Sequence, residues 1–472
     1  MQAHSPGHQT SQSKRPRNSG KHMALALLAV LALAVEPTVA NAQSLRFIRD
    51  AEIEDLLADY AKPIFKAAGL ASQKVKVRII EDHNFNAFVL DGRNVFINTG
   101  ALEDSTTPNA IIGVLAHESG HIAGGHMAAL RTRVARDSSM ALLMQILGMG
   151  ALIAGAVGGG ANKGATTAVG QSVLTATPEV ATRSILSYRR IQESSADQAG
   201  VKYLTLTHQS AIGMLTVFRK FADDELLSGI NPATYVSSHP ASRDRIAQLE
   251  ELAKSSAFFQ TLDPPELQQR HDLMRAKLIG FLETPQTVFN RYPQSDNSLP
   301  ARYARSIAAF KSGGIDTALP IIDGLIRERP QNAYFWEQKA DFLSKRGKHA
   351  EAAAALRKAI SLLGEQTLMQ AELAAELLGT QDKKYLAEVV SLLRKTVVTD
   401  ETSDAFRQLA TAYFGLGNEG EADLASAQAN VLDGNAKDAK GFAKRAQKLL
   451  PSGSQAWLKA DDIIKIQEAS GQ

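Results

Sequence analysis

Five consecutive residues, His117-Glu118-Ser119-Gly120-His121, have the types and spacing of a metal-binding motif. On a helix, two histidines four residues apart project from one face, so both imidazoles can bind one Zn²⁺ ion at ~2.0–2.1 Å. Glu118 would lie beside them, where a carboxylate can take the proton of a water that attacks a peptide carbonyl. The motif therefore predicts zinc-dependent peptide hydrolysis.

The residues before the motif predict that it lies on a buried helix. Thr107 is a suitable N-cap, Pro108 fits the first helical position, and residues 111–116 (IIGVLA) are almost wholly apolar. A chance match on a solvated helix is the alternative. Unpaired histidines in a protein core would be costly, so the apolar surroundings favour the metal site.

Two segments offer a third zinc ligand. His126 follows the motif closely, but a longer zinc motif would place its histidine at position 127, which is Met127. A displacement by one residue turns a helical side chain by ~100°, which argues against His126. Glu193 lies further along the chain and would complete a set of two histidines and one glutamate with an open fourth position.

Glu193 and Asp197 are four residues apart and would share one face of a predicted helix. Asp197 can accept a hydrogen bond from the second ring nitrogen of a ligand histidine and so fix its tautomer. The alternative is an ordinary solvated face beside Arg189 and Arg190. The presence of His117 and His121 in the same chain favours the metal interpretation.

A further histidine, His239, precedes Pro240, which disfavours the helical conformation at position 239. We expect His239 near the metal, in one of two roles. It donates a hydrogen bond to the oxyanion of the reaction, or it occupies the fourth coordination position until substrate displaces it. Arg243 would organise this loop through a carboxylate. A surface histidine without function is the remaining alternative.

Residues 74–80 (KVKVRII) alternate between charged and apolar side chains and predict a half-buried strand, and residues 94–98 (NVFIN) predict a second one. A strand beside the metal helix can bind an extended peptide through its free edge. A purely structural hairpin is the alternative, and the sequence does not separate the two.

Several segments together resemble one family of enzymes. These are the HExxH motif, ESSAD at 193–197, NAFVLDGRNVFINTG at 86–100 and HPASR at 239–243. Over about residues 44–250 the chain is similar to the zinc metallopeptidases typified by the CaaX prenyl endopeptidase and the HtpX-type membrane proteases. The resemblance implies an α+β zincin-type domain, mostly helical with a small sheet. It also implies one Zn²⁺ per chain on His117, His121 and Glu193, with Glu118 as the catalytic carboxylate.

The first 42 residues have the pattern of a cleaved secretory signal. Basic residues precede an uncharged run at 23–35, and Ala40-Asn41-Ala42 is a small-residue cleavage site. The run is short for a membrane anchor, which is the alternative. The absence of cysteine suits an exported, periplasmic chain. A second uncharged segment, 140–160, is expected to form a glycine-rich flap that covers the cleft or contacts a membrane surface. A packed core helix with a glycine loop is the alternative.

The C-terminal half repeats with a period of 34 or 35 residues, marked by Gly313, Gly347, Asp382 and Gly417. Alanine follows each marker after five residues, at 318, 352, 387 and 422, where helices can approach closely. This period is typical of tetratricopeptide repeats, which form an all-α solenoid with a concave binding surface. We expect a peptidase domain at 43–258, connecting helices and a linker at 259–300, and repeats at 301–472.

The overall charge narrows the function classes. The net charge of +3 on 472 residues argues against a nucleic-acid-binding protein.

The resemblance to an exported branch of the family implies that unfolded or misassembled outer-membrane polypeptides are substrates. It also implies that an outer-membrane protein assembly complex docks on the repeats. A repeat-based chaperone or scaffold with a silent metal site is one alternative, and a secreted digestive metalloprotease is another.

Overall fold

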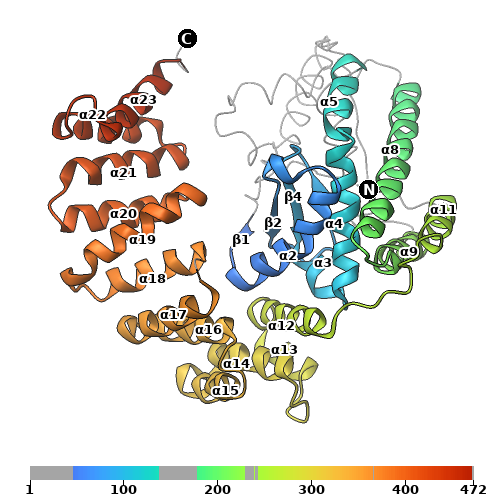
Figure 1. Ribbon diagram of the computed structural model, residues 1–472, viewed down its shortest axis with the longest axis horizontal. Coiled ribbons are helices and arrows are strands. Elements are labelled where there is room, and N and C mark those ends of the chain that lie inside the picture. The colour runs from blue at the N-terminus through green and yellow to red at the C-terminus, as the bar shows by residue number, and fades with distance from the viewer. Residues whose placement is uncertain (1–45, 138–177, 229–238, 240–242, 365, 470–472) are drawn as a thin grey trace, which may run out of the picture. The chain divides into compact units, whose positions relative to one another are not determined.

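The computed structural model describes residues 46–137, 178–228, 239, 243–364 and 366–469 (Figure 1). The predicted signal segment 1–42 and the uncharged segment 140–160 lie outside these residues. Within the described ranges, no helix has both the length and the hydrophobicity required to cross a membrane. As predicted, the structure is mostly helical with one small sheet, and its C-terminal region is entirely helical.

The sheet has four strands in the order β1-β2-β4-β3. They are β1 (Phe47–Ile48), β2 (Lys76–Ile80), β3 (Ala87–Val89) and β4 (Asn94–Asn98). β2 and β4 are parallel, with Lys76 opposite Asn94, whereas β3 is antiparallel to β4 and forms an edge. The predicted strand 94–98 is confirmed. The strand predicted at 74–80 begins only at Lys76, because residues 71–73 form a 3₁₀ turn.

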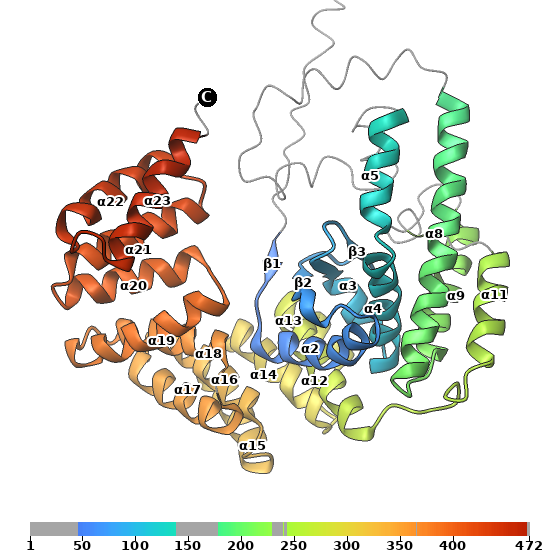
Figure 2. The ribbon, with the colours of Figure 1, turned by 45° about the horizontal axis from the view of Figure 1, so that its top comes forward.

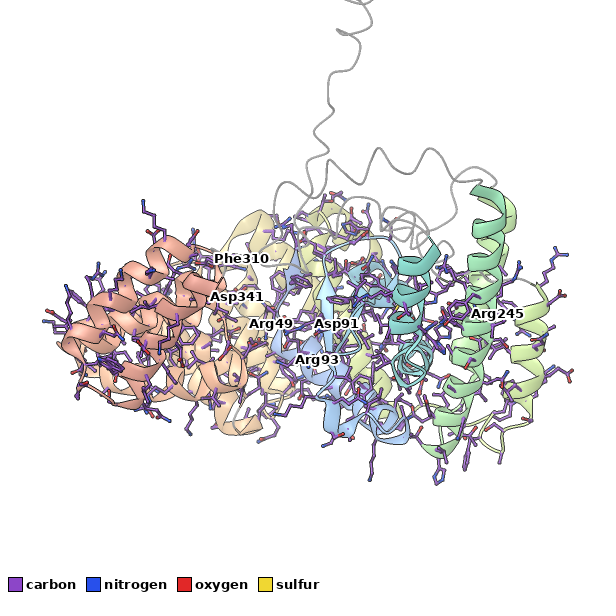
Figure 3. All side chains as sticks on the ribbon, turned by 90° about the horizontal axis from the view of Figure 1, so that it is seen from above. Arg49, Asp91, Arg93, Arg245, Phe310 and Asp341 are labelled. Carbon is purple, nitrogen blue, oxygen red and sulfur yellow. The ribbon has the colours of Figure 1, made fainter. Side chains whose placement is uncertain are left out.

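A tight turn joins β3 to β4. The carboxylate of Asp91 accepts hydrogen bonds from the backbone N–H groups of Arg93 and Asn94, both at 2.9 Å. Figure 3 labels Asp91 and Arg93 of this turn. Gly92 has φ +71°, a conformation that glycine adopts without steric cost. β3 and β4 therefore form the hairpin of the sheet. The two strands predicted from the sequence, β2 and β4, pair in parallel.

The predicted motif helix is α4 (Pro108–Ala123), which begins at Pro108 after the N-cap Thr107. Its apolar residues are buried as expected, with Ile111 and Leu115 at 0% exposure. The other helices of this part are α2 (Ala51–Ala67), α3 (Thr99–Asp104), α5 (His126–Asp137), α8 (Pro178–Leu206), α9 (Ile212–Ser228) and α11 (Arg243–Lys254). α4 packs against α2, α8 and α9, so the motif lies at the centre of the core (Figure 2).

Two helices lead to the C-terminal region: α12 (Pro265–Leu282) and α13 (Pro285–Arg291). α12 contributes to two cores. Met274 and Leu278 pack in the core that contains α4, whereas Leu273 packs in the core of the following helices with Tyr303 and Phe335. α12 therefore connects the core around α4 with the core of the helices that follow.

The C-terminal region consists of successive helical hairpins. Its helices are α14 (Leu299–Gly313), α15 (Ile315–Glu328), α16 (Ala333–Ser344), α17 (His349–Leu363), α18 (Thr367–Gly379), α19 (Leu386–Thr399), α20 (Ser403–Gly415), α21 (Glu419–Leu432), α22 (Ala436–Leu449) and α23 (Gln455–Ala469). The turns within hairpins have positive φ at Gly314, Gly347, Gln381 and Gly417. The residues that mark the repeat in the sequence thus lie at or beside these turns: Gly313, Gly347, Asp382 and Gly417. Ala387 is exposed, because a 3₁₀ turn at Lys383–Tyr385 delays the start of α19.

Candidate active site

Glycine allows α4 and α8 to touch backbone to backbone. A Cβ on Gly120 would lie 2.9 Å from the Cα of Ala196, closer than side chains tolerate. One turn along, a Cβ on Gly200 would lie 3.3 Å from the backbone nitrogen of His117. This close approach puts Glu193 and Asp197 of α8 directly against the histidines of α4.

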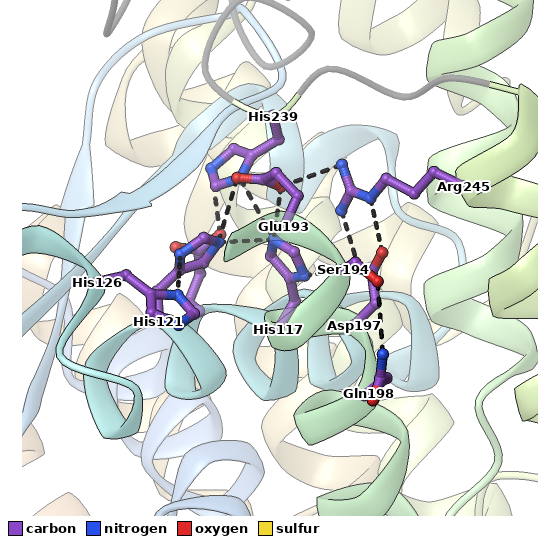
Figure 4. A network of polar contacts seen from close by, with 10 residues as sticks. His117, His121, His126, Glu193, Ser194, Asp197, Gln198, His239 and Arg245 are labelled. Atoms are coloured by element: carbon purple, nitrogen blue, oxygen red, sulfur yellow. Dashed lines mark hydrogen bonds and ion pairs between the residues drawn. The ribbon is translucent and has the colours of Figure 1, made fainter. Parts of the chain in front are cut away.

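Four buried side chains converge at this contact: His117, His121, Glu193 and His239 (Figure 4). The Nε2 atom of His117 lies 3.1 Å from His121 Nε2 and 3.2 Å from His239 Nδ1. Oε2 of Glu193 lies 3.4 Å from His117 Nε2 and 3.1 Å from His239 Nδ1, and Oε1 of Glu193 lies 3.4 Å from His121 Nε2. Residues far apart in the sequence therefore direct their ligand atoms at one point.

These distances fit a bound cation. Four ligands at ~2.0–2.1 Å from a tetrahedral zinc ion are separated by about 3.3–3.4 Å, close to the separations observed here. An imidazole nitrogen that carries no proton is a metal ligand, and three imidazole nitrogens face this one point. The donor set of imidazoles and a carboxylate matches zinc in its chemistry as well.

Glu118 lies beside this cluster and is fully buried. Neither of its carboxylate oxygens has a hydrogen-bond partner among the described residues. Its Oε1 lies 3.5 Å from Nε2 of His239. Burial raises the pKa of Glu118 to about 7, so the side chain can both accept and release a proton near neutral pH.

A second layer of residues orients the cluster. Oδ1 of Asp197 lies 3.0 Å from Nδ1 of His117, as expected for a residue that fixes a ligand tautomer. Nδ1 of His126 lies 3.1 Å from Nδ1 of His121, so His126 contacts a candidate ligand from behind and is not part of the four-residue cluster. Both α4 histidines are thereby held through the ring nitrogen that faces away from the cluster.

Arg245 holds the two carboxylates of α8. Its guanidinium donates to both oxygens of Asp197, at 2.6 and 2.8 Å, and pairs with Glu193 at 3.0 Å. The same group lies 5.0 Å from the centre of the Phe218 ring. Arg243, the residue expected in this role, is exposed at the start of α11. Arg245 was not predicted from the sequence. The residue at which α11 starts determines whether Arg243 or Arg245 faces the site, and the sequence does not fix that residue.

The edge strand β3 lies next to the cluster. Asn86, Phe88 and Val89 line one pocket together with Glu118, His121, Glu193 and His239. On the far side, Met127, Leu130, Arg189 and Gln192 complete its wall. An extended chain that paired with β3 would pass beside Glu118.

The sequence of this chain is similar to those of known proteins. Residues 48–253 match the model of Peptidase family M48. The Beta-barrel assembly-enhancing protease of Escherichia coli (strain K12) is 23% identical over 403 residues, which is 83% of this chain and 78% of the relative. The Putative beta-barrel assembly-enhancing protease of Vibrio cholerae is 24% identical over 396 residues, 82% of this chain and 78% of the relative. The similarity extends beyond the peptidase segment into the helical hairpins.

Proposed function

We propose that this chain, whose residues 48–253 belong to peptidase family M48 and form a zinc metalloprotease, degrades misfolded or stalled outer-membrane proteins in the periplasm. The convergence of His117, His121 and Glu193 on one point, at separations of 3.1–3.4 Å, is the observation that carries this proposal. The relatives are named for β-barrel assembly, which supports the substrate class.

Each residue of the site has a role in this proposal. His117, His121 and Glu193 hold the zinc ion, which when bound supplies a Lewis acid for the scissile carbonyl and its attacking water. Glu118 accepts the proton of that water and passes it to the leaving amine. Asp197 fixes the ring of His117, and Arg245 holds Asp197 and Glu193 in position.

His239 acts as a gate in this proposal. Its Nδ1 atom lies 3.2 Å from His117 Nε2 and 3.1 Å from Glu193, which is the place of a fourth ligand. A catalytic zinc site needs that position for water or substrate. The enzyme is therefore silent while His239 occupies the position, and becomes active when a substrate displaces the ring.

Substrate would bind in an extended form along β3. The strand forms an edge of the sheet and contributes Phe88 and Val89 to the pocket beside Glu118. Edge pairing reads the peptide backbone and tolerates many side chains. Such binding selects unfolded segments, because a folded β-barrel has already paired its strands.

The helical hairpins α14–α23 are proposed to be a tetratricopeptide solenoid that docks substrate or an outer-membrane protein assembly complex. Their turn period and the names of the relatives support this role. Exposed apolar side chains such as Phe414, at 69% exposure, offer contacts for a partner. A cleaved signal at 1–42 would deliver the chain to the periplasm.

One experiment tests the proposed substrate class. Purified wild-type protein and Glu118→Gln are incubated with an outer-membrane β-barrel protein, either unfolded in urea and diluted or folded in detergent. We expect wild type to fragment only the unfolded form, and Glu118→Gln to fragment neither. Equal cleavage of the folded barrel, or cleavage of casein without cleavage of the unfolded barrel, would contradict the proposal.

A further inference from the structure

A second group of metal-ligand side chains lies outside the active site. His83, Glu103 and Glu283 each offer one ligand atom, and these atoms lie within 4.8 Å of one another. His83 is in the segment between β2 and β3, Glu103 is on α3, and Glu283 is the C-terminal cap of α12. The three residues share no member with the cluster around His117.

The segment that carries His83 is fixed on the first turn of α3. The backbone N–H of Gly100 donates to the carbonyl of Asp82 at 2.9 Å, and the side-chain amide of Asn98 donates to the carbonyl of Asn84 at 3.2 Å. A Cβ on Gly100 would lie only 2.1 Å from the carbonyl oxygen of His83, so only glycine fits there. His83 thus lies one helical turn from Glu103 on a preorganised backbone.

Arg275 fixes the third element. Its guanidinium, from α12, donates to the backbone carbonyl of Glu103 at 2.9 and 3.1 Å. The contact uses the main chain of Glu103 and leaves the carboxylate free. Glu283 ends α12, where the carbonyl end of the helix dipole attracts positive charge.

The carboxylate of Glu103 needs a partner. Glu103 is only 7% exposed, and its Oε1 has no hydrogen-bond partner among the described residues. A buried carboxylate without a partner is unfavourable by several kcal/mol, so such a group is normally protonated or bound to a cation.

We propose that His83, Glu103 and Glu283 bind a second divalent cation, best matched by Zn²⁺. One imidazole and two carboxylates are a normal zinc donor set, with water at the remaining position. The ion draws the three side chains together from their present separations. It links α3, which leads directly into the motif helix α4, to the end of α12. In this position the ion fastens the peptidase domain to the helices that follow it.

Metal counting tests this proposal on the full-length protein. The chain is stripped with a chelator, dialysed against Zn²⁺, and analysed by mass spectrometry of the metal. We expect two zinc ions per chain in wild type and one in His117→Ala/His121→Ala. His83→Ala and Glu103→Gln should also hold one zinc while they keep peptide cleavage. Asp104→Asn, which removes a charge from the neighbouring position of α3, is the matched control and should keep two.

Thermal unfolding provides a readout that does not depend on proteolysis. Added Zn²⁺ should raise the unfolding temperature of His117→Ala/His121→Ala, and this shift should vanish when His83→Ala is added to that variant. His83 is exposed, so its removal tests the site even if Glu103→Gln does not fold. One zinc ion in wild type, or none in His117→Ala/His121→Ala, would overturn the second site and leave the proposed protease function intact.

Discussion

The two histidines of α4, His117 and His121, are each held by a contact at the outer ring nitrogen. Asp197 contacts Nδ1 of His117, and His126 contacts Nδ1 of His121, so both Nε2 atoms face the metal position. His239 differs, since its Nδ1 atom itself faces the cluster and its Nε2 lies near Glu118. His117 and His121 thus present Nε2 to the cluster, whereas His239 presents Nδ1.

We expect His239→Ala to raise the turnover of a short peptide or to cause self-cleavage, because the fourth position is then open from the start. Initial rates on a fluorogenic peptide and the appearance of self-digestion products measure this effect. Unchanged zinc content is the control for an intact site. A fall of ~10²–10³-fold in turnover would instead assign His239 to the oxyanion, on the usual scale for one such donor.

At the scale of elements, local patterns predicted α4 with its first residue, the strand 94–98 and the shared face of Glu193 and Asp197. β1 and β3 were not predicted, because two and three residues are too few to show an alternating pattern. Arg245 was missed for a related reason: its contacts depend on the packing of α11 against α8, which no local pattern encodes. The packing of elements that are distant in the sequence therefore determines the short strands and the contacts of Arg245, which the local motifs do not predict.

α2, α3 and α12 meet at a buried histidine. Nε2 of His271 donates to the carbonyl of Ser105 at 2.8 Å, and the hydroxyl of Tyr60 donates to Nδ1 at 3.0 Å. Burial, together with the charge of Arg275, lowers the pKa of His271 to about 4. The folded protein therefore holds this imidazole in its neutral form.

We expect His271 to make folding stability fall as the pH drops from about 6.5 to about 4. In this window the unfolded chain binds a proton at His271 and the folded chain does not, so acid favours unfolding. The expected loss is about 3 kcal/mol over the window. Urea unfolding at several pH values measures it. His271→Gln should reduce the slope, whereas the same change at the exposed His208 should not; an unchanged slope in His271→Gln would contradict this role.

At the scale of the whole molecule, one buried lysine joins the peptidase domain to the helical hairpins. Nζ of Lys277, on α12, lies 2.8 Å from Asp50 and 3.5 Å from Glu52 at the start of α2, and 3.0 Å from Glu337 on α16. Arg49 makes a further pair with Asp400 beyond α19, at 2.7 Å. These contacts couple the stability of the two regions.

We expect the two regions of the wild type to unfold together on heating. Both tryptophans, Trp336 and Trp457, lie in the hairpins, so their fluorescence reports that region, while peptide cleavage reports the peptidase domain. Lys277→Met leaves buried carboxylates without their partner, which should cost ~3–5 kcal/mol and separate the two transitions. Lys254→Met, which removes an exposed pair with Glu250, should change neither. Coincident transitions at the wild-type temperature in Lys277→Met would refute the coupling.

Casein cleavage and zinc content of wild type and Glu118→Gln test most directly whether this chain is a zinc peptidase that uses Glu118 as its proton acceptor. Glu118 lies beside the cluster and is not one of its four ligand side chains, so the substitution should leave the zinc content unchanged. Without the carboxylate that accepts the proton of water, casein cleavage should fall to the background of a zinc-free sample. Cleavage at the wild-type rate by Glu118→Gln with full zinc content would contradict the role of Glu118 as proton acceptor. Loss of zinc from that variant would contradict its position outside the ligand set.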